Sequence, residues 1–236
     1  MKTELWYKKL GYVENPFSIK PAFFNDEVVG YDAEVDSLIK KLAKGEVCFL
    51  EAEFGKGKST IIKYVINEFV NHNKIIHISR NKSDRALDYE NLLKEANTSF
   101  GKVFGLKAKN VILIVDEVGK INQKDCEQIE KFMKSKNIFS VLFADVSFAK
   151  TNLTDSLKKK IDKNLIKLKD LIPNDAVEIV KSRISTEGII SDDLIISIFE
   201  KSKRNTRSFL INLEKVFRYS FDNGNQKISS NDLTCL

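Results

Sequence analysis

A glycine-rich turn between an apolar run and a helix constrains this sequence more than any other feature. The run Val47–Glu51 predicts a buried strand, and the segment from about Lys58 to Val70 predicts a helix. Glycines at such a junction let backbone N–H groups converge on phosphate oxygens, and the helix N-terminus adds partial positive charge. The turn therefore predicts a phosphate-binding loop, with the sequence Ala52-Glu53-Phe54-Gly55-Lys56-Gly57-Lys58-Ser59-Thr60.

This turn fits the pattern GxxxxGK[ST], except that Ala52 replaces the first glycine. In a loop of this kind Lys58 reaches the β- and γ-phosphates of a nucleotide, and the Ser59 hydroxyl coordinates Mg²⁺. The alternative is an ordinary surface turn in a lysine-rich chain. The other residues expected to contact the nucleotide from this loop are Glu53, Phe54, Gly55, Lys56, Gly57 and Thr60.

A second motif supports nucleotide binding. The apolar run Val111–Val115 predicts a buried strand, and it ends in Asp116 and Glu117. At the carboxyl end of a parallel strand, Asp116 is placed to help hold Mg²⁺, and Glu117 to orient and deprotonate a water. A helix-capping Asp-Glu pair is the alternative. Together the two motifs predict ATP or GTP binding, with Ser59 and Asp116 as metal ligands.

The rest of the chain predicts an α/β fold with an all-helical end. Short apolar strands alternate with helices, which is typical of a parallel sheet covered on both faces. After about Leu171 only helical spacing remains, with Pro173 at the start of the first helix. The further elements expected before Leu171 are helices over Asp32–Lys44 and Gln123–Lys134 and strands over Lys74–Ser79 and Phe139–Phe143.

Size and composition fit this division. The chain has 236 residues, of which 42% are hydrophobic and 31% charged, as in an ordinary globular protein. We expect residues 1–170 to form a nucleotide-binding domain, with residues 1–30 as an irregular segment packed on it, and residues 171–236 to form a helical lid. Three cysteines without a CxxC, and an N-terminus without a secretory pattern, indicate a cytoplasmic protein without a membrane partner.

The combination resembles the AAA+ ATPases, most closely their ExeA/TniB-like and origin-recognition branch. Glu14-Asn15-Pro16-Phe17 is similar to the ENPF opening of ExeA-like ATPases, and Val28–Glu34 to the box that precedes the first helix. The resemblance implies a three-layer αβα P-loop NTPase domain, with Walker A and Walker B motifs and a helical lid. It favours ATP over GTP, with Val29 bordering the adenine. Arg204-Asn205-Thr206-Arg207 is similar to the GNPR motif, which makes Arg207 the sensor-2 arginine that reaches the γ-phosphate.

Two positions depart from the family pattern. A small polar sensor-1 residue is usual after the fourth strand, and here Asp145 or Ser147 could serve, with Asp145 the residue expected at the nucleotide. An arginine finger, which acts on the neighbouring subunit's ATP, is matched only by lysines, with Lys160 aligned best. A lysine supplies charge without a bidentate fork. Hydrolysis is therefore expected to be slow, triggered by a partner, or not organised by a homo-oligomer.

Positive charge bears on the choice of partner. The net charge is +6, and Lys150–Lys169 holds seven lysines against two aspartates. This segment is a candidate nucleic-acid contact, and a solvated face beside an oligomer interface is the alternative. About 15 residues follow Phe221, which is too few for the winged-helix domain usual in origin-binding initiators.

The sequence thus predicts an ATP hydrolase with Glu117, Lys58 and Arg207 as catalytic residues and ATP and Mg²⁺ as ligands. Its turnover would drive a conformational switch acting on a nucleic-acid or protein partner, or within an AAA+ oligomer. The alternative is an ATP-binding scaffold or DNA-associated adaptor that does not hydrolyse ATP. A nucleotide kinase is disfavoured, because no arginine-rich acceptor lid is visible.

Overall fold

The computed structural model describes residues 5–20, 28–79, 88–96, 107–184 and 188–236. The chain divides into two compact units. The sheet unit comprises residues 31–54 and 61–169, and the helical unit comprises residues 1–30, 55–60 and 170–236.

The sheet unit is built on five parallel strands in the order β2-β3-β4-β1-β5 among the described residues. The predicted parallel sheet is confirmed, and the central strands are almost fully buried, as their continuous apolar runs indicate. One strand, β5, was not predicted from the sequence. The strands are β1 (Val47–Glu51), β2 (Lys74–Ser79), β3 (Val111–Asp116), β4 (Ile138–Asp145) and β5 (Leu165–Lys167).

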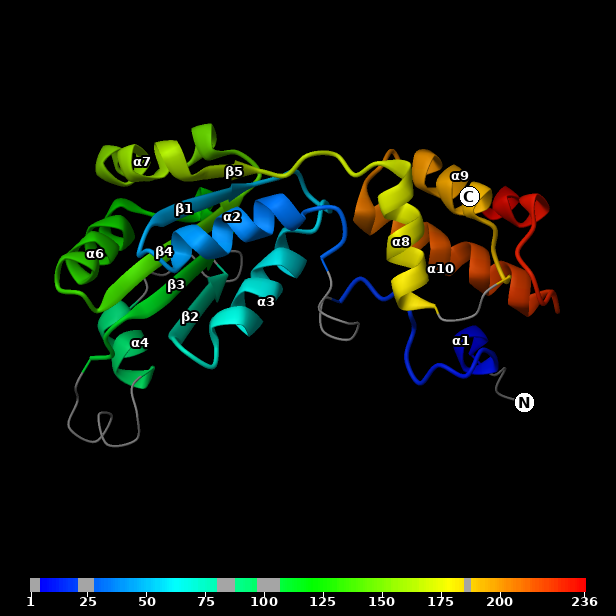
Figure 1. Ribbon diagram of the computed structural model, residues 1–236, viewed down its shortest axis with the longest axis horizontal. Coiled ribbons are helices and arrows are strands. Elements are labelled where there is room, and N and C mark those ends of the chain that lie inside the picture. The colour runs from blue at the N-terminus through cyan, green and yellow to red at the C-terminus, as the bar shows by residue number, and fades with distance from the viewer. Residues whose placement is uncertain (1–4, 21–27, 80–87, 97–106, 185–187) are drawn as a thin grey trace. The chain divides into compact units, whose positions relative to one another are not determined.

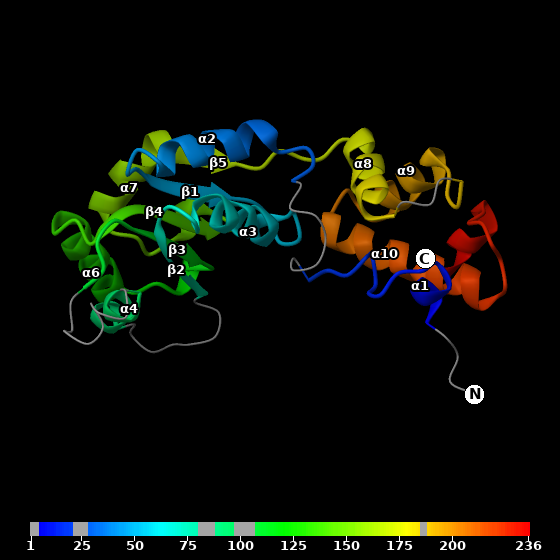
Figure 2. The same ribbon diagram turned by 60° about the horizontal axis from the view of Figure 1, so that its bottom comes forward.

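Helices cover both faces of this sheet (Figures 1 and 2). Alternate residues of β1 point to opposite faces, so Phe49 joins the cluster with α4, α6 and α7, while Leu50 faces the other side. On that other side α2 packs on β1, β4 and β5. The helices of this unit are α2 (Asp32–Leu42), α3 (Lys58–Phe69, from Ile61 onward), α4 (Tyr89–Glu95), α6 (Gln123–Lys134) and α7 (Asp155–Ile161).

Local signals explain where these helices begin and end. Asn122 and Asp125 form a reciprocal capping box at the start of α6, and Thr154 caps α7 through its side chain. Gly45, with φ +79°, follows α2 and turns the chain into β1. Burial raises the pKa of the Cys48 thiol on β1 to about 12, so that this cysteine stays protonated in the core.

The helical unit contains three main helices and two short ones among its described residues. Asn205 caps α10, and Pro173 begins α8 as the sequence predicts. The unit has its own apolar core, which includes Phe199, Phe209 and Phe217. Its elements are α1 (Trp6–Lys9), α8 (Pro173–Arg183), α9 (Asp192–Lys201), α10 (Thr206–Asp222) and the 3-10 helix η5 (Ser230–Cys235).

The N-terminal segment belongs to the helical unit. The rings of Trp6 and Phe17 stack 5.8 Å apart, and both contact the ring of Phe217 on α10. The Arg183 guanidinium of α8 donates hydrogen bonds to the backbone oxygens of Pro16 and Ser18. For residues 5–20 these contacts are thus with α8 and α10 of the helical unit, whereas packing on the nucleotide-binding domain stays a prediction; residues 1–4 and 21–27 lie outside the described part of the chain.

Among the described residues, no helix has the length and apolar character needed to cross a bilayer.

Candidate functional site

Polar side chains form a row across the carboxyl end of the sheet. The strand register pairs Ser79 of β2 with Asp116 of β3, and Asp145 of β4 with Glu51 of β1. Asp116 is also paired with Ala144, the residue before Asp145. Because parallel strands end at the same side of a sheet, these carboxylates lie together where the strands stop. The register thus places Asp116 and Asp145, two residues predicted for the site, at the ends of neighbouring strands.

Glu117 follows β3 in an uncommon backbone conformation. Its φ is 59° and its ψ 53°, in the left-handed region that non-glycine residues rarely adopt. Its N–H donates to the Asp116 carboxylate at 3.0 Å, and its own carboxylate accepts a hydrogen bond from the Ser79 hydroxyl at 2.9 Å. The Glu117 side chain is thereby directed along the carboxyl end of the sheet towards β2.

Asp145 ends β4 with hydrogen bonds to both carboxylate oxygens. Oδ2 accepts from the Gly119 N–H at 2.5 Å, and Oδ1 from the Val146 N–H at 2.6 Å. Gly119 lies in the short helix η2 (Val118–Lys120), which directly follows Glu117. In this structure Asp145 therefore holds the backbone that carries Glu117, whereas its predicted contact with a nucleotide stays a prediction.

Glu51 links three elements at the same end of the sheet. Its carboxylate pairs with Lys167 of β5 at 2.8 Å and accepts from the Phe148 N–H at 2.7 Å. Burial raises the pKa of Glu51, but the hydrogen bonds from Lys167 and Phe148 and the charge of Lys167 together bring that pKa below its ordinary value. The residue is thus held ionised beside the start of the predicted phosphate loop.

The predicted phosphate loop joins β1 to α3, as the sequence indicates. Gly55 has φ +84° and Gly57 φ +98°, which are conformations that favour glycine. The Thr60 N–H donates to the Gly57 carbonyl at 3.0 Å, and Lys58, Ser59 and Thr60 form the first turn of α3. The backbone therefore changes direction at the two glycines, directly before the N-terminus of the helix.

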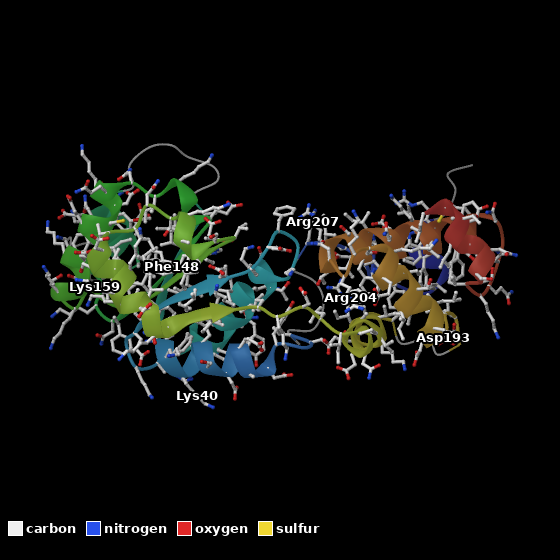
Figure 3. The ribbon with its side chains drawn as sticks, turned by 90° about the horizontal axis from the view of Figure 1, so that it is seen from above. Lys40, Phe148, Lys159, Asp193, Arg204 and Arg207 are labelled. Atoms are coloured by element: carbon white, nitrogen blue, oxygen red, sulfur yellow. The ribbon has the colours of Figure 1, made fainter. Side chains whose placement is uncertain are left out.

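The loop contacts the start of α10 within the helical unit. The Arg207 N–H donates to the Gly55 carbonyl at 3.0 Å. A side chain on Gly55 would meet the Asn205 Oδ1 at 2.5 Å and the Arg207 Cβ at 3.0 Å. The structure thus brings together two predicted site residues, Gly55 and Arg207, and Figure 3 shows Arg207 at the beginning of its helix.

An ion pair further ties the loop to the segment before α8. The Lys56 ammonium lies 2.5 Å from the Asp170 carboxylate, and Lys56 is only 17% exposed. The hydrogen bond and the charge of Lys56 lower the pKa of Asp170. The Lys56 side chain therefore contacts Asp170, whereas the predicted contact of its backbone N–H with phosphate stays a prediction.

Three other positions singled out from the sequence have defined surroundings. Val29 precedes Gly30, whose φ is +80° and whose backbone approaches Leu171 closely. Arg204 forms an ion pair with Glu200 four residues before it on α9. Lys160 is exposed in the last turn of α7, and its carbonyl accepts from the Asn164 side chain.

Sequence reasoning missed three contacts of this region. They are the hydroxyl of Ser79 on Glu117, the pairing of Lys56 with Asp170, and the approach of Asn205 to Gly55. A polar residue at the end of the apolar run in β2 was a usable signal for Ser79. The other two depend on contacts between segments more than a hundred residues apart in the chain.

No protein-family model matches the sequence, and no curated protein is detectably related to it in sequence. Solved structures are nevertheless similar to it in fold. The Orc1 protein of Aeropyrum pernix, solved in complex with DNA, has a TM-score of 0.71 at 13% identity, over 94% of this chain and 68% of that one. Cdc6p from Pyrobaculum aerophilum has a TM-score of 0.71 at 13% identity, over 92% of this chain and 68% of that one.

A third similar structure is the RuvB Holliday junction branch migration motor of Thermotoga maritima. Its TM-score is 0.67 at 17% identity, over 87% of this chain and 68% of that one. Identities this low establish the fold and nothing finer. The predicted fold class is confirmed: a parallel sheet of five described strands between helices, matching the P-loop NTPase fold, with a helical C-terminal part.

Proposed function

We propose that this chain is an ATPase of the AAA+ class. It would bind Mg²⁺–ATP and hydrolyse it slowly, and the resulting conformational switch would act on a nucleic-acid or protein partner complex. The observation that carries the proposal is that one chain contains both a loop turned by glycines at the start of α3 and the pair Asp116 and Glu117 at the end of β3. The similar folds of Orc1, Cdc6p and RuvB support it.

Each proposed site residue has a chemical task. The loop N–H groups from Glu53 to Thr60 and the Lys58 ammonium would bind the phosphates. Glu117 would accept a proton from the attacking water, and Val29 would border the adenine. We assign the γ-phosphate contact to Arg207, supported by the hydrogen bond that ties its backbone to Gly55.

The donor set fits magnesium. The Ser59 hydroxyl and the Asp116 carboxylate are hard oxygen ligands, and Mg²⁺ commonly takes few protein ligands and completes its shell with phosphate and water. In the described part of the chain no cluster of three or more His, Cys, Asp or Glu side chains offers an all-protein cage, in keeping with that mode. When bound, the ion would neutralise charge on the phosphate oxygens.

The helical unit would act as the lid. The proposed lid begins at residue 171, and the helical unit comprises residues 170–236 together with residues 1–30 and 55–60. Arg207, Asn205 and Gly55 all belong to the helical unit. If nucleotide binding moves the backbone of the loop, the start of α10 would therefore move with it.

Replacing Glu117 with glutamine tests the proposal. The amide keeps the size of the side chain but cannot accept the proton of water, so ATP binding should persist while kcat falls by about 10²- to 10⁴-fold. Binding of a fluorescent ATP analogue and release of phosphate measure the two quantities. Glu68→Gln, at an exposed position of α3, is the matched control. A Glu117→Gln variant that hydrolyses ATP as fast as the wild type contradicts the proposal.

A scaffold that binds ATP without hydrolysing it is the second candidate. It is favoured by Lys160, an exposed lysine where the family resemblance implies an arginine finger. Phosphate release by the wild-type chain, measured with and without DNA, separates the candidates. ATP binding without turnover under any condition would favour the scaffold.

A further inference from the structure

The side of the sheet opposite the candidate site carries a series of lysines. All strands of the sheet run the same way, so their amino ends lie together at the opposite end from Asp116 and Asp145 (Figure 1). Four neighbouring strands, β3, β4, β1 and β5, are each preceded within three residues by an exposed lysine. We call these residues the amino-end lysines: Lys109, Lys136, Lys44 and Lys163.

Contacts between the loops hold these lysines on one continuous surface. The Asn110 N–H donates to the Lys136 carbonyl, which joins the loops before β3 and β4. Gly45 lies against the ring of Phe139, which joins the turn before β1 to the start of β4. The Lys41 ammonium donates to the Lys163 carbonyl at 3.2 Å, which joins the end of α2 to the segment before β5.

The amino-end lysines differ from several basic neighbours in having no acidic partner among the described residues. Within the described part of the chain, the amino-end lysines form no ion pair. The loops that contain them hold two acids, of which Glu46 is already paired with Lys41 and Asp162 is exposed. Three basic neighbours are ion-paired: Lys40 with Asp36, Lys41 with Glu46 and Lys131 with Glu90. Further basic residues lie in the last turns of α6 and α7 and at the start of β2: Lys74, Lys134, Lys158, Lys159 and Lys160.

The opposite end of the sheet has the reverse character. Three of its strands, β1, β3 and β4, end in or next to Glu51, Asp116, Glu117 and Asp145, whereas β5 ends in Lys167, which pairs with Glu51. The sheet unit is therefore polarised along its strands, with acids at the carboxyl end and lysines at the amino end. The amino end therefore attracts an extended anion at a surface separate from the candidate site.

Helix dipoles explain only part of this pattern. Lysines in the last turn of a helix are favoured by the negative end of its dipole, which accounts for Lys134 and Lys158–Lys160. Lys109 follows no helix among the described residues, and Lys163 lies in a 3-10 turn. Lys136 has φ +57°, a conformation after a helix that glycine adopts with less strain. A lysine thus occupies a position whose backbone conformation favours glycine.

The dimensions fit a nucleic-acid backbone. Neighbouring strands lie about 4.8 Å apart, so four adjacent strands span roughly 14 Å. Over roughly 14 Å a DNA duplex presents about 8 phosphates. A row of flexible ammonium groups of this length can follow a phosphate backbone without reading its bases.

We propose that the amino-end lysines bind the phosphodiester backbone of nucleic acid, independently of sequence. This inference specifies the partner class of the proposed switch, but its test does not depend on ATP turnover. The proposal involves only part of the basic segment Lys150–Lys169. In that segment Lys167 and Lys169 pair with Glu51 and Glu34, whereas Lys159 and Lys163 lie towards the amino end; Figure 3 shows Lys159 on the outer side of α7.

Salt-dependent binding to duplex DNA tests the proposal. Fluorescence anisotropy with two 30-base-pair duplexes of unrelated sequence should give equal affinities. If all four lysines contact phosphates, the slope of log K against log salt should be about −3.6, which is a loss of about 150-fold between 50 and 200 mM salt. The variant Lys109→Gln/Lys136→Gln/Lys163→Gln should reduce the magnitude of that slope by about 2.7.

A matched control removes the same charge elsewhere on the sheet unit. Lys120, Lys124 and Lys150 are exposed and lie outside the amino-end surface, so their triple change to glutamine should leave the slope unchanged. Lys136→Gly separates the effect of lost charge from an effect on folding. Glycine relieves the strain of the left-handed backbone, and the change removes one proposed lysine–phosphate contact. It should raise thermal stability and still weaken binding at 50 mM salt.

Several outcomes would overturn the proposal while leaving the proposed ATPase intact. One is that the wild-type protein hydrolyses ATP but does not bind DNA. Another is that the two triple variants lose DNA affinity equally. A third is that the affinity for DNA does not change with salt concentration. Polyglutamate or vesicles of anionic lipid that bind the amino-end lysines more tightly than duplex DNA would assign the surface to another class of partner. Single-stranded RNA of equal length shows whether the backbone recognised is confined to DNA.

Discussion

At the scale of single residues, Asp145 shows how a side chain can serve a site without contacting its ligand. Both of its carboxylate oxygens accept backbone N–H groups, one from Val146 and one from Gly119. Gly119 lies two residues after Glu117, whose backbone is left-handed. The geometry therefore indicates that Asp145 positions the segment carrying the proposed catalytic glutamate.

Replacing Asp145 with asparagine should separate positioning from nucleotide binding. One oxygen would still accept, but the new NH₂ group would face a backbone N–H and lose the second hydrogen bond. A hydrogen bond to a charged group contributes about 1.5–3 kcal/mol, so kcat should fall by about tenfold or more. The KM for ATP should change less than twofold, as measured by steady-state phosphate release.

Asp162→Asn, an exposed change in the same unit, is the control for lost charge. A rise in KM for ATP with unchanged kcat would instead assign Asp145 to the nucleotide, as the family resemblance implies.

At the scale of elements, the contact between the phosphate loop and α10 depends on the absence of a side chain at Gly55. A Cβ there would lie 2.5 Å from the Asn205 Oδ1, and Asn205 also caps α10 through the Ser208 N–H. Gly55→Ala should therefore displace the loop from the start of α10 and weaken ATP binding at least tenfold, as measured with a fluorescent ATP analogue.

Gly224→Ala is the control for the destabilisation that an alanine at positive φ causes in the same unit. Gly224 has φ +83°, close to the +84° of Gly55, but no atom lies within 4 Å of a Cβ built there. Both variants carry the strain of an alanine at positive φ, about 1 kcal/mol. Equal losses of ATP binding in the two variants would show that general destabilisation of the helical unit, rather than the Asn205 contact, weakens binding.

Elements with a strong local pattern were predictable, and those formed by distant contacts were not. The apolar runs of β1 and β3 gave their bounds closely, because a strand buried on both faces leaves a continuous signal. β5 has three residues, Leu165–Lys167, and is a strand because Leu165 pairs with Phe49 of β1. Two apolar residues beside a lysine carry no period that identifies such a strand.

The same division holds within the candidate site. The loop glycines and the Asp116-Glu117 pair follow from motif chemistry, whereas the hydrogen bond between Ser79 and Glu117 follows from the register of β2 and β3. The left-handed backbone of Glu117 has no signal in the residue type, since glutamate rarely adopts it. Sequence thus identifies the reactive groups, and the tertiary register determines which neighbour each one meets.

At the scale of the whole molecule, each unit has an apolar core of its own. The N-terminal aromatics complete the core of the helical unit, although their sequence pattern suits either unit. Trp6 is the only tryptophan of the chain and is 2% exposed beside Phe17 and Phe217. Its fluorescence therefore reports on the helical unit alone, and far-UV circular dichroism reports on both units.

Phe17→Ala should destabilise the helical unit selectively. Phe17 is fully buried between Trp6 and Phe217, and deleting a buried phenylalanine ring costs about 3–5 kcal/mol through lost burial and the cavity left behind. In a urea titration the Trp6 emission should shift to longer wavelength at lower urea, ahead of the main loss of dichroism. Phe17→Leu, which leaves a smaller cavity, should lie between the variant and the wild type. Val13→Ala, at a position 87% exposed in the same segment, should leave the emission transition unchanged; coincident transitions in all these proteins would mean that residues 5–20 add nothing to the stability of the helical unit.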